Sequence, residues 1–294
     1  MDSQTPLIKL PVIDFSKPEL KPGTNEWDLV KGQVHVALRD YGCFEATFDK
    51  IPINLRESIF GSLEELFDLP LQTKIRNVSK KPYHGYVGQY PQVPLYESRA
   101  SMMQTKTIQS FSQQLSELDR NIRRMVLESF GLEKYMNEHM DSTNYLLRVM
   151  KYKGTETTET KLGLNSHTDK NVVTILYQNE VDGLEVQTKE GEWINVKPSK
   201  QSFTVMIGES LYAWLNGRVY APYHRVMMTR DKARYSAGLF SIPKAGYTIN
   251  ASDEVVDEEH PLLFKPFDHV KFMGFYYTEA GQKAESALKV YCGV

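Results

Sequence analysis

A series of short, β-rich runs in the second half of the chain limits most strongly what it can fold into. Each run has the length of one strand, and turn-forming pairs such as Asp182-Gly183 and Asn216-Gly217 lie between the runs. The runs span residues 146–152, 172–178, 184–187, 193–196, 203–207, 223–228 and 235–242. Many short strands at this spacing are typical of a sandwich or barrel, so we expect a jelly-roll core over residues 143–245.

Helical patterns flank this core. Apolar residues recur at steps of three and four along 27–38, 55–67 and 108–126, which predicts three helices with one buried face each. We expect Asn25 to cap the first of them, and a further helix near residues 280–288. The sequence therefore predicts a mixed, mainly β fold that is a single domain over residues 1–294, with helices from both ends of the chain wrapped around the β core.

The segment 80–101 has no periodicity and is rich in proline, glycine and tyrosine. We interpret it as an irregular loop. Such a loop is either a surface connection or, because aromatic loops often line binding sites, a wall of a substrate pocket. It ends a distinct N-terminal wrapping region that we assign to residues 8–105.

Composition excludes several classes of partner and compartment. The net charge of −2 gives no electrostatic basis for binding nucleic acid or an anionic membrane, and no run of some 20 apolar residues predicts a membrane span. The first ten residues lack the apolar stretch of a secretory signal. Two cysteines, Cys43 and Cys292, are too few for a disulfide framework, so we expect a cytoplasmic protein.

Two histidines and one aspartate form a candidate metal site. His167 and Asp169 are two residues apart, so on an extended segment both side chains leave the same face, and His224 lies in another predicted strand. Two imidazoles and one carboxylate fit the facial set that holds Fe(II) and leaves other coordination positions open. Mn or a catalytic zinc ion would also accept these ligands. The alternative is that each histidine makes a local hydrogen bond and the charges are solvated.

Arg234 and Ser236 favour a catalytic site over that alternative. They too are two residues apart, and they lie on the strand that follows His224. An arginine that points into a β core is costly unless it meets an anion, and its planar fork suits a carboxylate. A small dicarboxylate could therefore extend from the metal to Arg234.

These residues together resemble the plant 2-oxoglutarate- and Fe(II)-dependent dioxygenases along almost the whole chain. The matching segments are Leu-Pro-Val-Ile-Asp-Phe at 10–15, Tyr-Gly-Cys-Phe at 41–44, His-Thr-Asp at 167–169, Asn-Gly at 216–217, His-Arg-Val at 224–226 and Arg-Tyr-Ser at 234–236. Segments 161–164, 167–171 and 238–243 most resemble the AOP branch, which is named for glucosinolate alkenyl and hydroxyalkyl producing enzymes.

The resemblance implies a double-stranded β-helix core and a specific site. It implies Fe(II) on His167, Asp169 and His224, and the distal carboxylate of 2-oxoglutarate on Arg234 and Ser236. Tyr152 takes the place of a tyrosine that the family uses for the co-substrate. Two departures from the family pattern stand out. Met150 replaces the usual asparagine, and the stretch 98–107 is shorter than is usual.

The implied reaction consumes O2, converts 2-oxoglutarate to succinate and CO2, and oxidises a small molecule of plant specialised metabolism. We favour hydroxylation over desaturation or oxidative side-chain cleavage. A zinc-dependent hydrolase and a non-catalytic cupin-type binder are the alternatives from other classes. We expect a monomer whose substrate contacts come from Phe240, Tyr86, Tyr90 and Trp214, with Phe240 foremost because it shares a strand face with Arg234.

Overall fold

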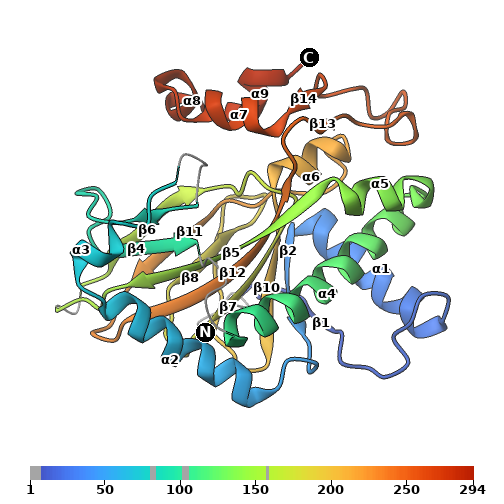
Figure 1. The fold of residues 1–294 in the computed structure, drawn as a ribbon. Helices are drawn as coiled ribbons and strands as arrows, with labels where there is room; N and C mark the ends of the chain where they lie inside the picture. The colour runs from blue at the N-terminus through green and yellow to red at the C-terminus, as the bar shows by residue number, and fades with distance from the viewer. Residues whose placement is uncertain (1–7, 80–83, 101–105, 157–158) are drawn as a thin grey trace, which may run out of the picture.

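Two β-sheets form the centre of the computed structural model, which describes residues 8–79, 84–100, 106–156 and 159–294 (Figure 1). The larger sheet has the strand order β1-β2-β10-β7-β12-β5-β4-β3, and the smaller has the order β6-β11-β8-β9. The strands of the larger sheet are β1 (Val12–Asp14), β2 (Cys43–Thr47), β3 (Tyr86–Val87), β4 (Tyr96–Ala100), β5 (Thr143–Tyr152), β7 (Val173–Gln178), β10 (Ser202–Ile207) and β12 (Arg234–Pro243). Those of the smaller sheet are β6 (Lys161–His167), β8 (Leu184–Gln187), β9 (Trp193–Asn195) and β11 (His224–Met228). The predicted jelly-roll fold class is confirmed, while its bounds at residues 143–245 stay a prediction, since β1 to β4 of the larger sheet precede them.

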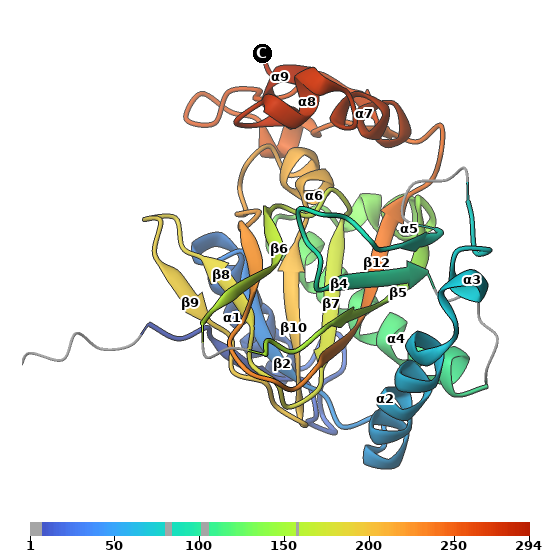
Figure 2. The same ribbon diagram turned by 90° about the vertical axis from the view of Figure 1, so that its left-hand side faces the viewer.

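Helices cover one face and one end of this core. The longer ones in the N-terminal half are α1 (Asn25–Asp40), α2 (Ile53–Asp68) and α4 (Lys106–Ser129), and the shorter ones are α3 (Leu71–Lys74) and α5 (Met136–Asp141). In the C-terminal half lie α6 (Glu209–Trp214), α7 (His269–Tyr276), α8 (Glu279–Lys283) and α9 (Ala287–Cys292), together with the small strand pair β13 (Thr248–Ile249) and β14 (Phe267–Asp268). Figure 2, turned by 90°, shows that α7, α8 and α9 lie at the same end of the molecule as α6.

The two faces of the larger sheet have different partners, because side chains alternate along each strand. One face packs on α1, α2 and α4 and includes Val149, Ile175 and Leu239. The opposite face carries Met150, Tyr152 and Leu176, and it packs on apolar residues of the smaller sheet. We call this second face the inner face. It is the one on which the residues of the predicted site lie.

The prediction that residues 80–101 form an irregular loop is wrong for part of the segment. Residues 96–100 form β4, which pairs with β5, and all five of its residues are buried. The strand escaped prediction because it is polar on both faces, with Glu97 and Arg99 on the helix side and Ser98 on the inner side. Glu97 is compensated by Lys74, which lies far away in sequence, at 2.6 Å. Residues 80–83 and 101 lie outside the described residues.

Two smaller predictions also need correction. Thr24, rather than Asn25, caps α1, because its hydroxyl accepts a hydrogen bond from the Trp27 N–H. The single helix expected near residues 280–288 is two short helices, α8 and α9, each capped by its own hydroxyl residue. Within the described parts of the chain, no helix combines the length and the apolar character needed to span a membrane.

Candidate active site

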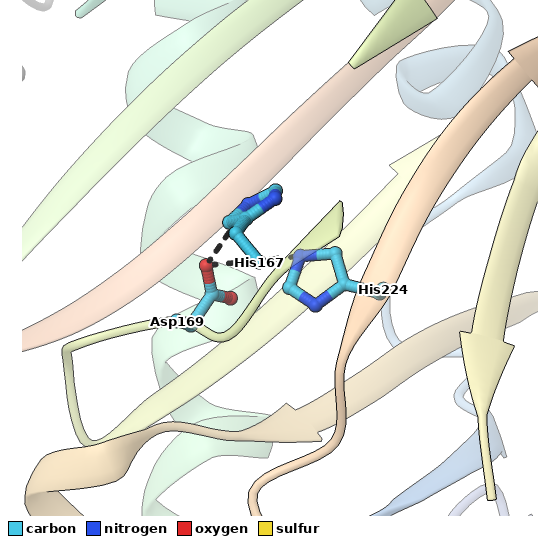
Figure 3. Close-up of side chains that lie close together, drawn as sticks. All are labelled: His167, Asp169 and His224. Carbon is cyan, nitrogen blue, oxygen red and sulfur yellow. Dashed lines mark ion pairs between the residues drawn. The ribbon is translucent and has the colours of Figure 1, made fainter. Parts of the chain in front are cut away.

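The ends of two paired strands bring the predicted metal ligands together. His167 ends β6 and His224 begins β11, and the two residues are directly opposite in the antiparallel register. Asp169 follows β6 by two residues, in the loop that leads to β7. One nitrogen from each histidine and one oxygen from the aspartate lie within 4.8 Å of one another (Figure 3).

Hydrogen bonds to the backbone set the tautomers of both histidines. The Nδ1 atoms of His167 and His224 lie 2.8 Å and 3.4 Å from the carbonyl oxygens of Asn165 and Pro222. A carbonyl can only accept, so Nδ1 carries the proton and Nε2 presents its lone pair. The Nε2 atoms lie 3.9 Å and 3.8 Å from Oδ1 of Asp169. Three metal-ligating atoms therefore face one point.

Desolvation also keeps His167 neutral. Desolvation, together with the nearby His224, lowers the pKa of His167 to about 4, against the opposing effect of Asp169. A metal competes with the proton for the same nitrogen, so a low pKa favours metal binding at neutral pH.

The Asp169 carboxylate is held by a residue that the sequence reasoning missed. The Thr174 hydroxyl, on the inner face of β7, donates to Oδ2 of Asp169 and leaves Oδ1 facing the histidines. The Glu209 N–H, at the start of α6, donates to the Asp169 carbonyl oxygen at 2.8 Å. Partners of this kind orient metal ligands and raise metal affinity.

A buried ion pair braces the same loop. Lys170 Nζ lies 3.0 Å from Glu209 Oε1 and 2.9 Å from the Thr168 carbonyl oxygen, which it donates to. The Thr168 hydroxyl also donates to Glu209. Lys170 further packs over the Tyr276 ring at 4.8 Å, so α7 contributes to this cluster. The sequence signal was available, since Lys170 follows directly on the ligand motif.

Arg234 and Ser236 lie on the inner face of β12, deep in the core. Both side chains are 0% exposed. The Arg234 Nε donates to the Gln178 side-chain oxygen at 3.0 Å, and Nη2 donates to the same oxygen. Among the described residues, neither Nη1 of Arg234 nor the Ser236 hydroxyl has a hydrogen-bond partner. Burial lowers the pKa of Arg234, and this desolvation cost is what an anion beside the guanidinium would offset.

Tyr152 and Phe240 share the face of Arg234. Tyr152 is opposite Arg234 in the register of β5 and β12, and its ring lies 5.0 Å from the guanidinium carbon. Its pKa is raised by burial, so the phenol is protonated. Phe240 is opposite Thr174, the residue that holds Asp169, and is half-buried. The structure therefore brings Phe240 to the level of the metal ligands.

The other three aromatic residues have different surroundings. The Tyr86 hydroxyl donates to Glu97 at 2.7 Å, on the side of β4 away from the inner face. Trp214 packs its ring 4.6 Å from His139 within the helix-side core, and Tyr90 is half exposed. These contacts give no support to the predicted contact of Tyr86 and Trp214 with substrate. For Tyr90, the structure shows only a position in the loop before β4.

Comparison with known proteins agrees with this geometry. The family described as the 2OG-Fe(II) oxygenase superfamily matches residues 138–243, and that described as the N-terminal part of a non-haem dioxygenase in morphine synthesis matches residues 10–114. The probable 2-oxoglutarate-dependent dioxygenase AOP1.2 of Arabidopsis thaliana is 52% identical, over 97% of this chain and 96% of its own length. The chain belongs to the plant 2-oxoglutarate-dependent dioxygenases, in the AOP branch.

Two further similarities bear on fold and activity. A solved structure titled as the dioxygenase for auxin oxidation in rice has a TM-score of 0.82 and 26% identity, and covers 97% of this chain and 100% of that chain. A probable inactive 2-oxoglutarate-dependent dioxygenase, AOP2 of Arabidopsis thaliana, is 36% identical over 98% of each chain. Because one relative is described as inactive, activity must be argued from the site residues.

The AOP relatives also contain residues with no counterpart here. The alignment with AOP1.2 runs over 308 positions, more than the 294 residues of this chain. The shorter stretch was predicted at 98–107. In the structure, residues 98–100 belong to β4, residues 101–105 lie outside the described parts, and α4 begins at Lys106. Its location there stays a prediction.

Proposed function

We propose that this chain is an active 2-oxoglutarate- and Fe(II)-dependent dioxygenase that hydroxylates a small plant metabolite. The observation that carries the proposal is a buried guanidinium and a buried hydroxyl with unmet hydrogen-bonding capacity, on the same inner face as Thr174, which holds Asp169. Nη1 of Arg234 and the Ser236 hydroxyl are both buried without a hydrogen-bond partner in the described structure. A zinc-dependent hydrolase has no use for such a site, which argues against that alternative.

The metal ligands fit Fe(II). His167, Asp169 and His224 offer two imidazoles and one carboxylate without a thiolate, the donor set of the facial triad. Their Nδ1–H groups are fixed by backbone carbonyls and the carboxylate is fixed by Thr174, so the ligands are oriented before a metal binds. Bound there, Fe(II) would supply the redox chemistry that activates O2.

The spacing along the inner face fits the co-substrate. Thr174 lies beside Asp169. Gln178, four residues after Thr174 on β7, lies beside Arg234. Four residues of a strand span about 13 Å, which two side chains and a five-carbon dicarboxylate can fill. Tyr152 would complete the pocket for the distal carboxylate, with Met150 where the family usually has an asparagine.

Three finer points belong to the same proposal. We assign Phe240 to the wall of the substrate site, because it lies at the level of Thr174. The carboxylate of Asp169 takes the position that halogenating relatives leave open for chloride, which argues against halogenation. We favour hydroxylation, with desaturation and oxidative side-chain cleavage as the alternatives at the same site. The proposal also includes O2 as the oxidant, a monomeric state and a cytoplasmic location.

Succinate release tests the proposal. The purified chain is loaded under nitrogen with Fe(II) and 2-oxoglutarate, then exposed to O2 with a panel of plant metabolites. Succinate should accumulate together with a product that is 16 mass units heavier than one panel member. The matched control, Arg234→Gln, should need a much higher 2-oxoglutarate concentration for the same rate. A chain that binds 2-oxoglutarate no better with Fe(II) than without any metal would refute the proposal, and it would then resemble a cupin-type binder.

A further inference from the structure

Tyr96, the first residue of β4, lies next to the tyrosine of the proposed co-substrate pocket. We propose that Tyr96 is a positioning residue for 2-oxoglutarate, because it holds the Tyr152 ring against the guanidinium of Arg234. The inference rests on the proposed function, since it adds to the site for the distal carboxylate a residue that acts through Tyr152.

The strand register aligns three side chains in one row across the inner face. Tyr96 of β4 is opposite Tyr152 of β5, and Tyr152 is opposite Arg234 of β12. Residues that are directly opposite on neighbouring strands point to the same side of the sheet and lie close enough to interact. A hydrogen bond of 2.9 Å from the Lys153 N–H to the Leu95 carbonyl oxygen extends the pairing of β4 and β5 beyond Tyr96. The backbone therefore fixes Tyr96 beside Tyr152.

The side chains in this row pack on one another. The ring centroids of Tyr96 and Tyr152 are 5.3 Å apart, with 38° between the ring planes, a spacing at which aromatic pairs attract. The Tyr152 ring in turn lies 5.0 Å from the guanidinium carbon of Arg234, within the range of a cation–π contact. Tyr96 and Tyr152 are both buried, so water does not take the place of either ring. Tyr152 is therefore packed between Tyr96 and Arg234.

The other surroundings of the Tyr152 ring are close and fixed. Gly163 of β6, in the smaller sheet, faces this ring so closely that a Cβ at position 163 would be 3.1 Å from Cδ1 of Tyr152. Gln178 fixes Arg234 from the side of β7, because its side-chain oxygen accepts from the Arg234 Nε at 3.0 Å. Loss of the Tyr96 ring would therefore open space on the β4 side, and Tyr152 could turn into that space, away from Arg234.

The orientation of Tyr152 matters for the co-substrate because its hydroxyl can donate a hydrogen bond. Burial, and to a lesser degree the neighbouring Tyr96, raise the pKa of Tyr152, so the phenol keeps its proton at neutral pH. Beside Arg234, this hydroxyl can donate to the carboxylate that the guanidinium binds, and such a bond depends on direction. The metal ligands lie at the other end of the inner face, beside Thr174. We therefore expect Tyr96 to affect the binding of 2-oxoglutarate and not the binding of the metal.

Two titrations of each variant test this assignment. Mn(II) replaces Fe(II) under nitrogen so that no turnover occurs, and calorimetry gives the Kd for Mn(II) and then the Kd for 2-oxoglutarate. Tyr96→Leu should raise the Kd for 2-oxoglutarate about three- to tenfold, up to the loss of one charge-assisted hydrogen bond, and leave the Kd for Mn(II) within about twofold of wild type. Tyr96→Phe keeps the ring and should bind both ligands as the wild type does.

Phe203→Leu is the matched control. Phe203 is a fully buried aromatic residue of β10 that packs on Phe48 in the helix-side core, away from the row of Tyr96. Like Tyr96→Leu, the control should lower the free energy of unfolding in urea titrations, because both changes remove a buried ring. It should nevertheless bind 2-oxoglutarate as the wild type does.

Comparison of the variants decides between the outcomes. Wild-type affinity of Tyr96→Leu for 2-oxoglutarate would overturn the proposal, and so would an equal loss of affinity in Phe203→Leu or in Tyr96→Phe. A Kd for Mn(II) that rose as much as the Kd for 2-oxoglutarate would also overturn it, because Tyr96 would then support the whole site. Tyr96→Met, whose flexible side chain fills gaps in a core, replaces the leucine variant if that variant does not fold, and should weaken 2-oxoglutarate binding in the same way. If the wild type bound 2-oxoglutarate no better with Mn(II) than without any metal, the proposed function itself would fail.

Discussion

Replacing Thr174 with valine should weaken metal binding without changing any metal ligand. The hydroxyl of Thr174 donates to Oδ2 of Asp169, and Thr174 is 1% exposed, so water cannot take over this bond. A hydrogen bond to a charged group contributes about 1.5–3 kcal/mol, and removing the partner of a metal ligand costs about 10- to 100-fold in metal affinity. Valine has nearly the shape of threonine, so the change removes the donor and leaves the packing. We therefore expect the Kd for Mn(II) to rise by about 10- to 100-fold.

Calorimetric titration of Mn(II) under nitrogen measures this effect directly. Thr204→Val is the matched control, because Thr204 is a buried threonine on the inner face of the neighbouring strand β10 and makes no hydrogen bond to Asp169. The control should bind Mn(II) within about twofold of wild type, because it leaves the hydrogen bonds that orient Asp169 in place. If Thr174→Val also bound Mn(II) with wild-type affinity, the inference that this hydroxyl orients the carboxylate would be wrong.

Three further sets of substitutions test the metal ligands, the co-substrate anchor and the packing of the fold. His224→Ala removes one of the three ligands and should abolish both Mn(II) binding and succinate release, measured by titration and by product analysis. Arg234→Gln should raise the KM for 2-oxoglutarate by at least about tenfold, because it removes a charge-assisted pair, and Ser236→Ala should raise it by a smaller factor; equal effects would contradict the assignment of the guanidinium as the main anchor. Gly208→Ala would place a Cβ 2.1 Å from a backbone oxygen in the loop before β7, so it should lower the free energy of unfolding by more than about 2 kcal/mol. Gly32→Ala lies in open space within α1 and should raise the free energy of unfolding by up to about 1 kcal/mol. Urea titrations measure both changes.

The alternation of side chains along strands made the inner face predictable from the sequence. The parity of Arg234, Ser236 and Phe240 places them on one face of any strand, and β12 has that face turned inward. The same rule applied to His167 and Asp169, even though the strand β6 itself was not among the predicted runs. Local backbone geometry alone decides such relationships, so a single sequence is sufficient.

Residues whose role depends on a distant partner were not predictable in this way. The sequence predicted a loop where β4 lies because Glu97 is charged. The charge of Glu97 is compensated by Lys74 only in the folded structure. Thr174 and Gln178 are unremarkable polar residues until the fold places them beside Asp169 and Arg234.

The C-terminal helices contribute to the site by holding the loop that carries Asp169. The Ser210 hydroxyl donates to the Lys170 carbonyl oxygen at 2.6 Å, so at 3.2 Å from His269 it can only accept, and Nδ1 of His269 carries the proton. Burial lowers the pKa of His269 to about 4, which keeps this residue of α7 uncharged at neutral pH. The loop is therefore fixed by Thr174 from the sheet and by α6 and α7 from the helices. Because its position is set before any metal arrives, little conformational entropy is lost when the carboxylate binds, and more of the coordination energy is available for affinity.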